Sequence, residues 1–561
     1  MKKLINDPRH LVRECLEGIA DLNADVALLD NENILVARVA EDVSERPVSV
    51  ISGGGSGHEP AHAGYVGHGM LSAAVAGDVF TSPSVDAVLA AIRSVSGPAG
   101  CVLIVKNYTG DRLNFGLAAE IASGEGIPTQ VVVVADDVAL SQTVPKERRR
   151  GLAGTVLIHK LAGAFASQGA SVDEVAEFAG SAAAELGTMG VALGACVVPA
   201  AGKPGFELAE QEIELGLGIH GEKGVRRVNI QPADAIVGIL VSTIVADLQL
   251  TEGDVVGVLV NGLGATPPIE LAVVARAALA NLRQRGIEVD RAWCGTLLSA
   301  LEMPGVSISL LKLDDRRIEA LDQVTDASAW PGRGQVPRER AVVAVPAVER
   351  ESRAVLPEGP LTPVLVAARD AVAQALLDNE EIFAELYRQA GDGDLGDSMV
   401  RGAHAMRELE QAAFATPSTF LMELAQTLRR AIAGSSGPFY AIGLARASRL
   451  LEGVEEPGLE HWVKAFEQAV IAIEELGGAK RGDRTMIDAL RPALDALNSA
   501  GHADGSQTLE AAAAAARAGA DATAGLRPSL GRASYLGDRA LGVKDGGAEV
   551  VAVWLEALSR L

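Results

Sequence analysis

The sequence predicts an α/β half followed by an all-α half, because its apolar residues change their spacing along the chain. Five short and almost wholly apolar runs recur within the first 330 residues, and they alternate with helical patterns rich in Ala, Leu and Glu. After residue 360 the apolar positions recur with the helical period alone. We therefore expect two α/β sub-domains followed by a helical domain.

The five apolar runs are the expected strands of the first half. They cover residues 48–51, 102–105, 131–134, 255–260 and 308–313. Apolar runs that are separated by helical segments favour mostly parallel sheets covered by helices on both faces. We expect an α/β domain over residues 1–335, with sub-domains at about 1–182 and 183–335.

The second half is expected to be an antiparallel bundle of helices. Residues 336–360 combine charges with Pro and Gly, which is typical of a linker. Helical periodicity then runs through residues 363–386, 418–433, 459–476 and 485–498, followed by an alanine-rich run at 511–516 and a last helix at 550–561. The predicted helical domain covers residues 361–561.

The composition argues against several classes of partner. A formal net charge of −24 opposes binding to nucleic acid and to anionic lipid, which both need clustered Lys and Arg. No apolar stretch reaches the ~18 residues of a membrane span, and none follows the two N-terminal lysines as in a signal peptide. The four cysteines form no C-x-x-C pair, which suits a reducing compartment. We expect a cytoplasmic protein that binds neither nucleic acid nor membrane.

A glycine-rich segment, SGGGSGHEP at residues 52–60, follows the first expected strand. Its glycines let backbone N–H groups approach a small ligand closely, and His58 stands where the segment ends. The segment is neither a G-x-G-x-x-G fingerprint nor a Walker loop, so a nucleotide is not its expected ligand. The structural alternative is a tight turn capped by a histidine.

Three more polar residues stand where an α/β fold binds ligands. Lys106 and Asp111 follow the second expected strand near its carboxyl end, and an Asp close to a His can act as a base or orient one. His220 lies between glycines and has no second His or Cys at metal-ligand spacing nearby, which favours a general base or a nucleophile that adds to a carbonyl carbon. The structural alternatives are a helix cap for Asp111 and an exposed loop for His220.

The predicted helical domain contains a second group of candidate site residues, and the first of these form an acidic turn. Asp392, Asp394 and Asp397 stand within six residues, and a hard cation such as Mg²⁺ would offset their mutual repulsion. The glycine spacing and the lack of a downstream Glu exclude an EF-hand, and the alternative is a solvated acidic turn. Turns at 433–438, 477–486, 531–537 and 544–548 carry Gly, Ser, Asp and Arg, which together favour a phosphate-binding site at one end of the bundle.

Taken together, the motifs resemble the dihydroxyacetone kinase family over nearly the whole chain. The strings that carry the resemblance are GGGSGHEP, KNYTGD, GIHGE, NGLG, SALEMPGVSISLLKLDD, GDGD, GSSGP, GDRTMIDAL and GRASYLGDRALG. Their order in one fused chain resembles the ATP-dependent members. The resemblance implies phosphorylation of dihydroxyacetone by ATP and Mg²⁺, a nucleotide domain of eight antiparallel helices, and a homodimer.

The resemblance also implies roles for individual residues. His220 would hold the ketone as a covalent hemiaminal, and Asp111 and His58 would act on the substrate hydroxyl as base and partner. The residues implied to bind the substrate are Gly55, Ser56, His58, Lys106 and Asp111. Asp392 and Asp394 would hold Mg²⁺. The residues implied to surround ATP are Leu395, Gly396, Asp397, Ser398, Ser435, Ser436, Gly477, Met486, Arg532, Asp545, Gly546 and Gly547.

The chain departs from the family pattern in its helical half. Tyr387 stands where the family usually has an Asp that completes the metal site, and Asp397 is the nearest carboxylate that could replace it. Leu395 and Asp397 themselves also differ from the usual residues, and Asp545-Gly-Gly replaces Asp-Pro-Gly. These changes suggest a branch that phosphorylates the four-carbon ketose erythrulose. The pattern also leaves open a non-catalytic ketone sensor and a lyase that splits flavin-adenine dinucleotide to a cyclic phosphate.

Overall fold

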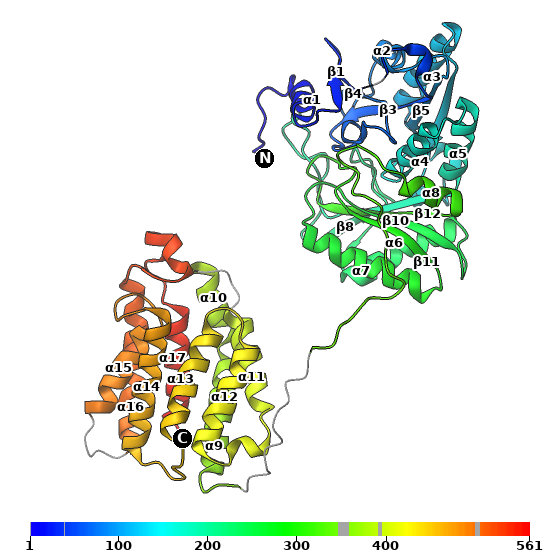
Figure 1. Ribbon diagram of the computed structural model, residues 1–561. Coiled ribbons are helices and arrows are strands. Elements are labelled where there is room, and N and C mark those ends of the chain that lie inside the picture. Colours follow the sequence, from blue (N-terminus) through cyan, green and yellow to red (C-terminus); the bar gives the residue numbers. More distant parts are fainter. Residues whose placement is uncertain (1, 39, 346–357, 391–394, 500–504) are drawn as a thin grey trace. The chain divides into compact units, whose positions relative to one another are not determined.

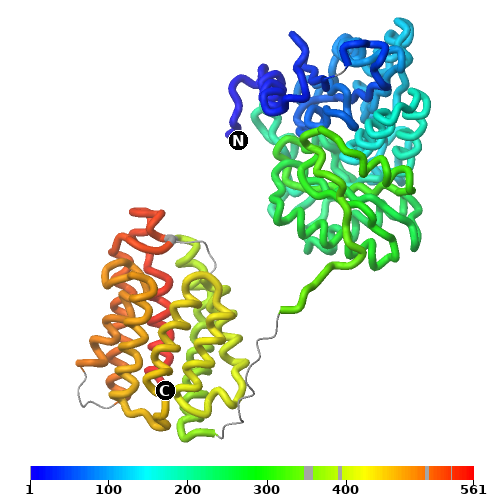
Figure 2. Tube along the Cα trace, viewed as in Figure 1, coloured from blue at the N-terminus to red at the C-terminus, as the bar shows by residue number. Residues whose placement is uncertain are grey.

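The computed structural model describes residues 2–38, 40–345, 358–390, 395–499 and 505–561. Contacts divide the chain into two compact units, Met1–Ala344 and Val345–Leu561 (Figures 1 and 2). The first unit contains two six-stranded sheets and the second is helical, so the predicted fold class is confirmed. The ends of the linker expected at 336–360 stay a prediction, since residues 346–357 lie outside the described part of the chain.

The first sheet has the strand order β1–β2–β4–β3–β5–β6. Its central strand β3 pairs in parallel with β4 and β5, and β5 pairs in parallel with β6, as expected. Helices α2 and α3 pack on one face, and α1, α4 and α5 contribute to the core on the other. The bounds are β1 Val26–Leu28, β2 Ile34–Ala37, β3 Ser49–Ser56, β4 Ala73–Val79, β5 Cys101–Lys106, β6 Thr129–Val134, α1 Leu11–Asp21, α2 Val85–Val95, α3 Thr109–Gly124, α4 Thr155–Ser167 and α5 Val172–Ala184.

The second sheet has the order β11–β10–β12–β7–β8–β9 and is mostly antiparallel, so the expectation of mostly parallel strands is wrong for it. Within it, β10 and β11 pair in parallel. Only residues 296–304 join β11 to β12, which is too short for the crossover that a parallel strand requires. The bounds are β7 Leu186–Ala192, β8 Glu212–Leu215, β9 Arg226–Asn229, β10 Val255–Gly262, β11 Glu288–Gly295, β12 Gly305–Lys312, α6 Ala233–Asp247, α7 Pro268–Gln284 and α8 Asp315–Asp322.

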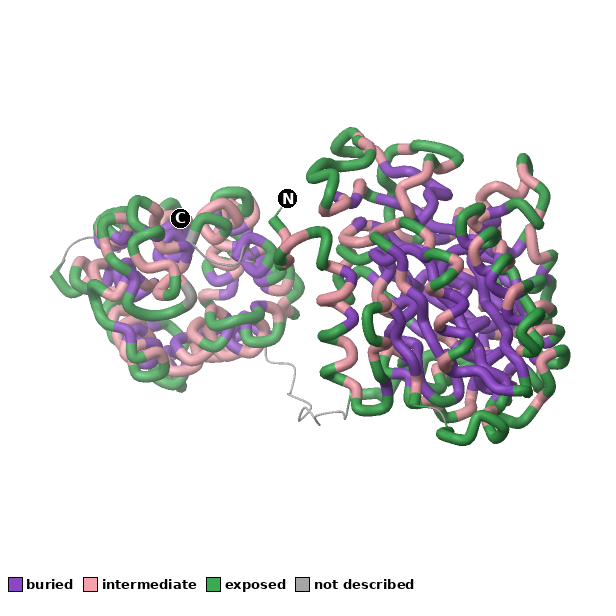
Figure 3. Tube along the Cα trace, turned by 90° about the horizontal axis from the view of Figure 1, so that it is seen from above, coloured by how far each residue is buried: buried purple, intermediate pink, exposed green. Residues whose placement is uncertain are grey.

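The α/β unit is held together by apolar residues that lie between its two sheets. Figure 3 shows the buried stretches gathered in the interior of this unit, with exposed segments around it. Helix α4 is buried along almost its whole length and joins the same core as residues of both sheets, such as Ile104 and Leu311. This shared core fixes the loops that follow the strands of one sheet against those of the other.

The helical unit is a closed ring of eight helices. Helix α9 packs against α11, each helix from α11 to α16 packs against the one that follows it, and α17 packs back against α9. The periodicity at 363–386 covers two helices, because α9 ends at Asp378 and α10 begins at Glu380. No described helix of either unit is long and apolar enough to cross a membrane. The bounds are α9 Thr362–Asp378, α10 Glu380–Ala390, α11 Leu395–Arg407, α12 Pro417–Ala431, α13 Ser436–Leu450, α14 Leu459–Gly477, α15 Ile487–Ser499, α16 Gly505–Ala522 and α17 Gly546–Leu558.

Candidate functional site

The glycine-rich segment at 52–60 was expected to follow a strand, but its first five residues belong to strand β3 itself. Strand β3 runs through Ser56, so Gly53–Gly55 lie in its carboxyl half, where β4 flanks them. A Cβ at Gly54 would stand 3.2 Å from the Lys106 Nζ and 3.5 Å from the Asp111 Oδ2. The glycine therefore brings the β3 backbone within reach of both polar groups.

His58 follows strand β3 of the first sheet and His220 follows strand β8 of the second, and the two rings come together. Their Nε2 atoms lie 3.1 Å apart, and their ring centroids are 4.9 Å apart. The Nδ1 of His58 lies 2.8 Å from the carbonyl oxygen of Ser299, which can only accept a hydrogen bond. His58 is therefore protonated on Nδ1 and directs Nε2 towards His220.

Glu222 holds His220 in place, and sequence reasoning gave this residue no role. One carboxylate oxygen lies 2.9 Å from the Nδ1 of His220, and the other accepts the backbone N–H of His220 at 2.9 Å. Burial raises the pKa of Glu222, but the hydrogen bonds from the ring and backbone of His220 outweigh it and bring the value to about 2. The available signal was its place in the GIHGE string.

Aromatic rings enclose the two histidines. Phe80 stacks on His58 with a centroid distance of 5.2 Å, and Phe80 and Tyr108 meet the His220 ring edge-on at 5.1 and 4.6 Å. Burial, together with the charge of Lys106 and the neighbouring His220, holds the pKa of His58 well below its usual value. His58 is thus a neutral imidazole at physiological pH.

Lys106 and Asp111 are both buried, and both side chains lie beside Gly54. Within the described part of the chain, neither the Lys106 Nζ nor the Asp111 Oδ1 has a hydrogen-bond partner, although both atoms are buried. Burial lowers the pKa of Lys106, and the charge of Asp111 opposes that shift. Buried polar atoms without partners are rare in native proteins, and a bound polar molecule would satisfy these two.

The remaining predicted substrate residue and two nearby histidines take less direct positions. Ser56 is buried, and its hydroxyl donates to the Gly77 carbonyl at 2.7 Å, which leaves the oxygen lone pairs for a ligand. Of two further histidines that follow the glycine-rich segment, His68 is exposed, but His62 is buried with its Nδ1 3.3 Å from the Ser52 hydroxyl. His62 therefore belongs to the interior behind the site.

A second site forms in the helical unit, where the glycine-punctuated turns meet at a cavity of about 270 Å³. Nine of the residues expected to surround ATP line it: Leu395, Ser398, Ser435, Ser436, Gly477, Met486, Asp545, Gly546 and Gly547. Gly396 and Asp397 do not line it, and Asp397 is exposed. Asp392, Asp394 and the side chain of Arg532 lie outside the described part of the structure. The turns thus converge even though their sequence positions span more than 150 residues.

The cavity is built for an anion, and Arg484 contributes to it without having been predicted. Helices α13 and α17 begin at the cavity, and helix N-termini favour negative charge. The Arg484 side chain is buried, and its Nη2 donates to the carbonyl oxygen of Val543 at 2.8 Å. Its Nε and Nη1 have no partner among the described residues. These two N–H groups could bind phosphate oxygens.

The turn before α17 carries Asp545, an acid whose pKa is raised. Asp545 caps this helix by accepting the Ala548 N–H at 2.8 Å. Burial raises the pKa of Asp545 to about 6, although its hydrogen bonds and the charge of Arg484 lower it in part. The described residues contain no group of three or more side chains that could hold a metal ion, so the expected Mg²⁺ site rests on the acidic turn.

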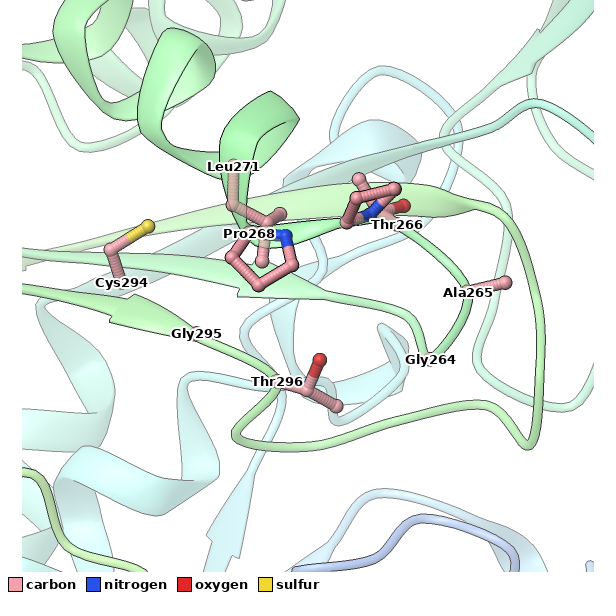
Figure 4. A pocket seen from close by; sticks show the side chains of 9 residues that line it. Gly264, Ala265, Thr266, Pro268, Leu271, Cys294, Gly295 and Thr296 are labelled. Carbon is pink, nitrogen blue, oxygen red and sulfur yellow. The ribbon is translucent and has the colours of Figure 1, made fainter. Parts of the chain in front are cut away.

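A further cavity in the α/β unit, of about 510 Å³, lies where β10 and β11 end (Figure 4). Its lining carries no charged or imidazole side chain, and Thr266, Cys294 and Thr296 supply its polar side-chain atoms. It therefore lacks the groups that acid–base or phosphoryl chemistry requires.

Comparisons with known proteins match both units of the chain. A Dak1 domain matches residues 17–329 and a DAK2 domain matches residues 389–560. A triokinase/FMN cyclase of Homo sapiens is 41% identical over 572 residues, covering 99% of this chain and 98% of its own. The dihydroxyacetone kinase of Citrobacter freundii is 37% identical over 566 residues, with 99% and 98% covered.

A solved structure extends the likeness to the fold. The crystal structure of the Citrobacter freundii dihydroxyacetone kinase in complex with AMP-PNP and Mg²⁺ matches with a TM-score of 0.64 at 35% identity, and it covers 100% of this chain and 99% of that chain. Because both domain models and full-length relatives span nearly all of its residues, this protein belongs to the dihydroxyacetone kinase family with fused Dak1 and DAK2 domains.

Proposed function

We propose that this protein transfers the terminal phosphate of ATP, with Mg²⁺, to a hydroxyl group of dihydroxyacetone that is held as a covalent hemiaminal on His220. The observation that carries the proposal is the meeting of His58 and His220 beside the buried Lys106–Asp111 pair. The Citrobacter relative carries the name dihydroxyacetone kinase, and its crystal structure was determined with AMP-PNP and Mg²⁺.

Capture of the ketone follows from the protonation of the two rings. Because Glu222 accepts the hydrogen on the Nδ1 of His220, the lone pair of His220 is on Nε2. The carbonyl carbon of the ketone would bond to Nε2, and its oxygen would take up one proton. A polyol such as glycerol has no carbonyl carbon and could not be captured in this way.

Phosphorylation then requires a base at a substrate hydroxyl. Asp111 is buried near Lys106, with one carboxylate oxygen that has no partner among the described residues. We assign it the role of base and His58 the role of its partner, and the unpaired ammonium of Lys106 would hydrogen-bond the substrate.

The cavity of the helical unit fits a nucleotide triphosphate. The starts of α13 and α17 and the free N–H groups of Arg484 suit phosphate oxygens. Asp392 and Asp394 would hold Mg²⁺, which neutralises charge on the phosphates when it is bound. Alignment and charge neutralisation are the main demands of phosphoryl transfer.

Erythrulose is the second candidate substrate, and the departures at Tyr387 and Gly546 favour it. It differs from dihydroxyacetone by one hydroxymethyl group, and a single group of this size gives an enzyme only about 1–3 kcal/mol of discrimination.

We also propose that the protein acts as a homodimer, which analytical ultracentrifugation would test.

The deciding experiment measures ADP release with Mg-ATP and a panel of dihydroxyacetone, both erythrulose enantiomers, glyceraldehyde and glycerol. We expect turnover with a short ketose and none with glycerol. His220→Ala should raise the KM for the ketose strongly and leave some turnover, because capture is lost while the base is retained. Silence with every ketose, or an unchanged KM in His220→Ala, would overturn the proposal.

A further inference from the structure

The structure assigns Glu222 as the residue that positions His220 for carbonyl capture, an inference that rests on the proposed function. Both carboxylate oxygens accept hydrogen bonds from His220 itself, one from the ring Nδ1 at 2.9 Å and one from the backbone N–H at 2.9 Å. Glu222 therefore fixes the ring's orientation and its tautomer in one contact.

The position requires a carboxylate rather than any polar side chain. An ionised carboxylate accepts at both oxygens, whereas a glutamine amide accepts at one end and presents N–H groups at the other. A glutamine at position 222 could accept the ring N–H or the backbone N–H, but would face the second donor with its own hydrogens. The low pKa of Glu222, about 2, keeps both oxygens ionised throughout the physiological range.

The surrounding chain is shaped to admit this carboxylate. A Cβ at Gly218 would lie 2.1 Å from the Glu222 Oε2, so any side chain at that position would displace the carboxylate from its place under His220. A Cβ there would also lie 2.7 Å from the Nη1 of Arg150, whose guanidinium pairs with Asp137. The Glu222 carboxylate thus occupies the space that Gly218 leaves free, and the Arg150 guanidinium borders the same space.

The charge of Glu222 also stabilises the captured state. When the Nε2 lone pair of His220 bonds to the carbonyl carbon, the C=O π electrons move to oxygen, and this oxygen takes up one proton from the buffer, so that the adduct gains one positive charge. The ring keeps its hydrogen on Nδ1 and becomes a cation with a carbon on Nε2. The carboxylate at Nδ1 compensates this new positive charge, and loss of such a charged hydrogen bond would weaken capture about 10- to 100-fold.

The test uses the full chain and dihydroxyacetone labelled with ¹³C at the carbonyl carbon. In the wild-type protein we expect a ¹³C resonance for a tetrahedral carbon, and ¹⁵N spectra should show His220 protonated on Nδ1. Glu222→Gln should lower adduct occupancy about 10- to 100-fold and alter the His220 tautomer signal, with melting temperature preserved. Glu222→Asp should recover part of the adduct. The matched control is Glu210→Gln, which removes an exposed carboxylate from the preceding connection, between β7 and β8.

The outcomes separate this inference from the proposed function. If wild-type protein forms no tetrahedral adduct, capture on His220 is wrong. If it forms the adduct and Glu222→Gln forms it equally well, with the same ¹⁵N tautomer signal, capture stands and the role of Glu222 is wrong. An equal loss in Glu210→Gln would also overturn the role, because the effect would then reflect the general negative charge around β8.

Discussion

The Nε2 atoms of His58 and His220 lie 3.1 Å apart, although the two residues are separated by 162 positions in the chain. Each ring donates its Nδ1 hydrogen to an oxygen that only accepts, the Ser299 carbonyl for His58 and the Glu222 carboxylate for His220. Two lone pairs therefore face each other across the contact. A proton between the rings would turn this repulsion into a hydrogen bond, and its departure would leave the Nε2 lone pair of His220 free to attack a carbonyl carbon.

Asp111→Asn tests the base separately from capture. The variant keeps the side-chain shape beside Lys106 but cannot take a proton, so kcat should fall about 100-fold or more, while the ¹³C signal of the adduct persists. Steady-state kinetics and NMR on the same sample measure both quantities. Asp86→Asn, in the first turn of the neighbouring helix α2, is the control and should change neither. Unaltered turnover in Asp111→Asn would remove this residue as the base.

Gly218→Ala tests the space beneath the Glu222 carboxylate without changing any charge. The added methyl group would lie 2.1 Å from the Oε2, so the carboxylate must move away from His220. We expect adduct occupancy to fall about ten-fold or more, as for loss of the charged hydrogen bond. The control is Gly205→Ala in the preceding connection, between β7 and β8, where the new Cβ has no heavy atom within 4 Å; it should leave occupancy unchanged. Equal occupancy in the two variants would show that the contact has no effect.

The sequence predicted five strands from their apolar runs, and missed short apolar strands such as β2 as well as strands of mixed pattern. Strands β3, β5, β6, β10 and β12 each overlap a predicted run. Strand β4, AAVAGDV, and strand β7, LGTMGVA, are rich in Ala and Gly, which have low intrinsic strand preference. Neighbouring strands bury both, and this tertiary context is invisible in a local window. Strand direction in the second sheet depended on the length of the connections, which the sequence runs alone did not define.

The site residues that stand in recognisable motifs were likewise predicted, and those whose role depends on the folded path of the chain were not. His58, Lys106, Asp111 and His220 were predicted because each stands beside glycines or at the end of an apolar run. The role of Arg484 depends on its reaching Val543, which is 59 positions away, and no local spacing encodes that contact. Such residues can be found from the sequence only when the folded path of the chain is already known.

Gly546→Ala tests the helical cavity as the nucleotide site. A Cβ at this position would lie 2.6 Å from the Leu395 Cδ2 and 3.0 Å from the Tyr387 Cδ2, so at least one side chain must shift within the cavity wall. Overpacking of this kind should weaken binding of AMP-PNP about ten-fold in calorimetric titration and leave the ketone adduct intact. Adding Leu395→Ala should restore part of the affinity.

The control for that change is Gly525→Ala, where the new Cβ has no heavy atom within 4 Å. It should bind AMP-PNP as the wild type does. Undiminished binding by Gly546→Ala would mean that the nucleotide does not contact this wall, and a matching loss of the ketone adduct would point to a general defect instead.

Asp545→Asn should stabilise the nucleotide-free protein, and by an amount that depends on pH. Burial raises the pKa of Asp545 from 3.8 to about 6, so the folded protein favours the neutral carboxyl group. Its contribution to the free energy of unfolding is complete below pH 3.8 and is lost as the pH rises through about 6. At pH 7.5 the ionised group therefore costs about 1–3 kcal/mol, a cost that asparagine avoids while its side-chain oxygen still caps α17.

Thermal unfolding followed by circular dichroism between pH 4 and pH 8 measures this difference. The variant should melt at a higher temperature than the wild type at pH 7.5, and the gap should shrink as the pH falls below about 6, because the wild-type carboxyl group then becomes neutral as well. The measurement near pH 4 is the internal control, since the two proteins then differ little in charge at this position. A gap that stays constant with pH, or a variant that is less stable at pH 7.5, would show that Asp545 is not held as a buried acid.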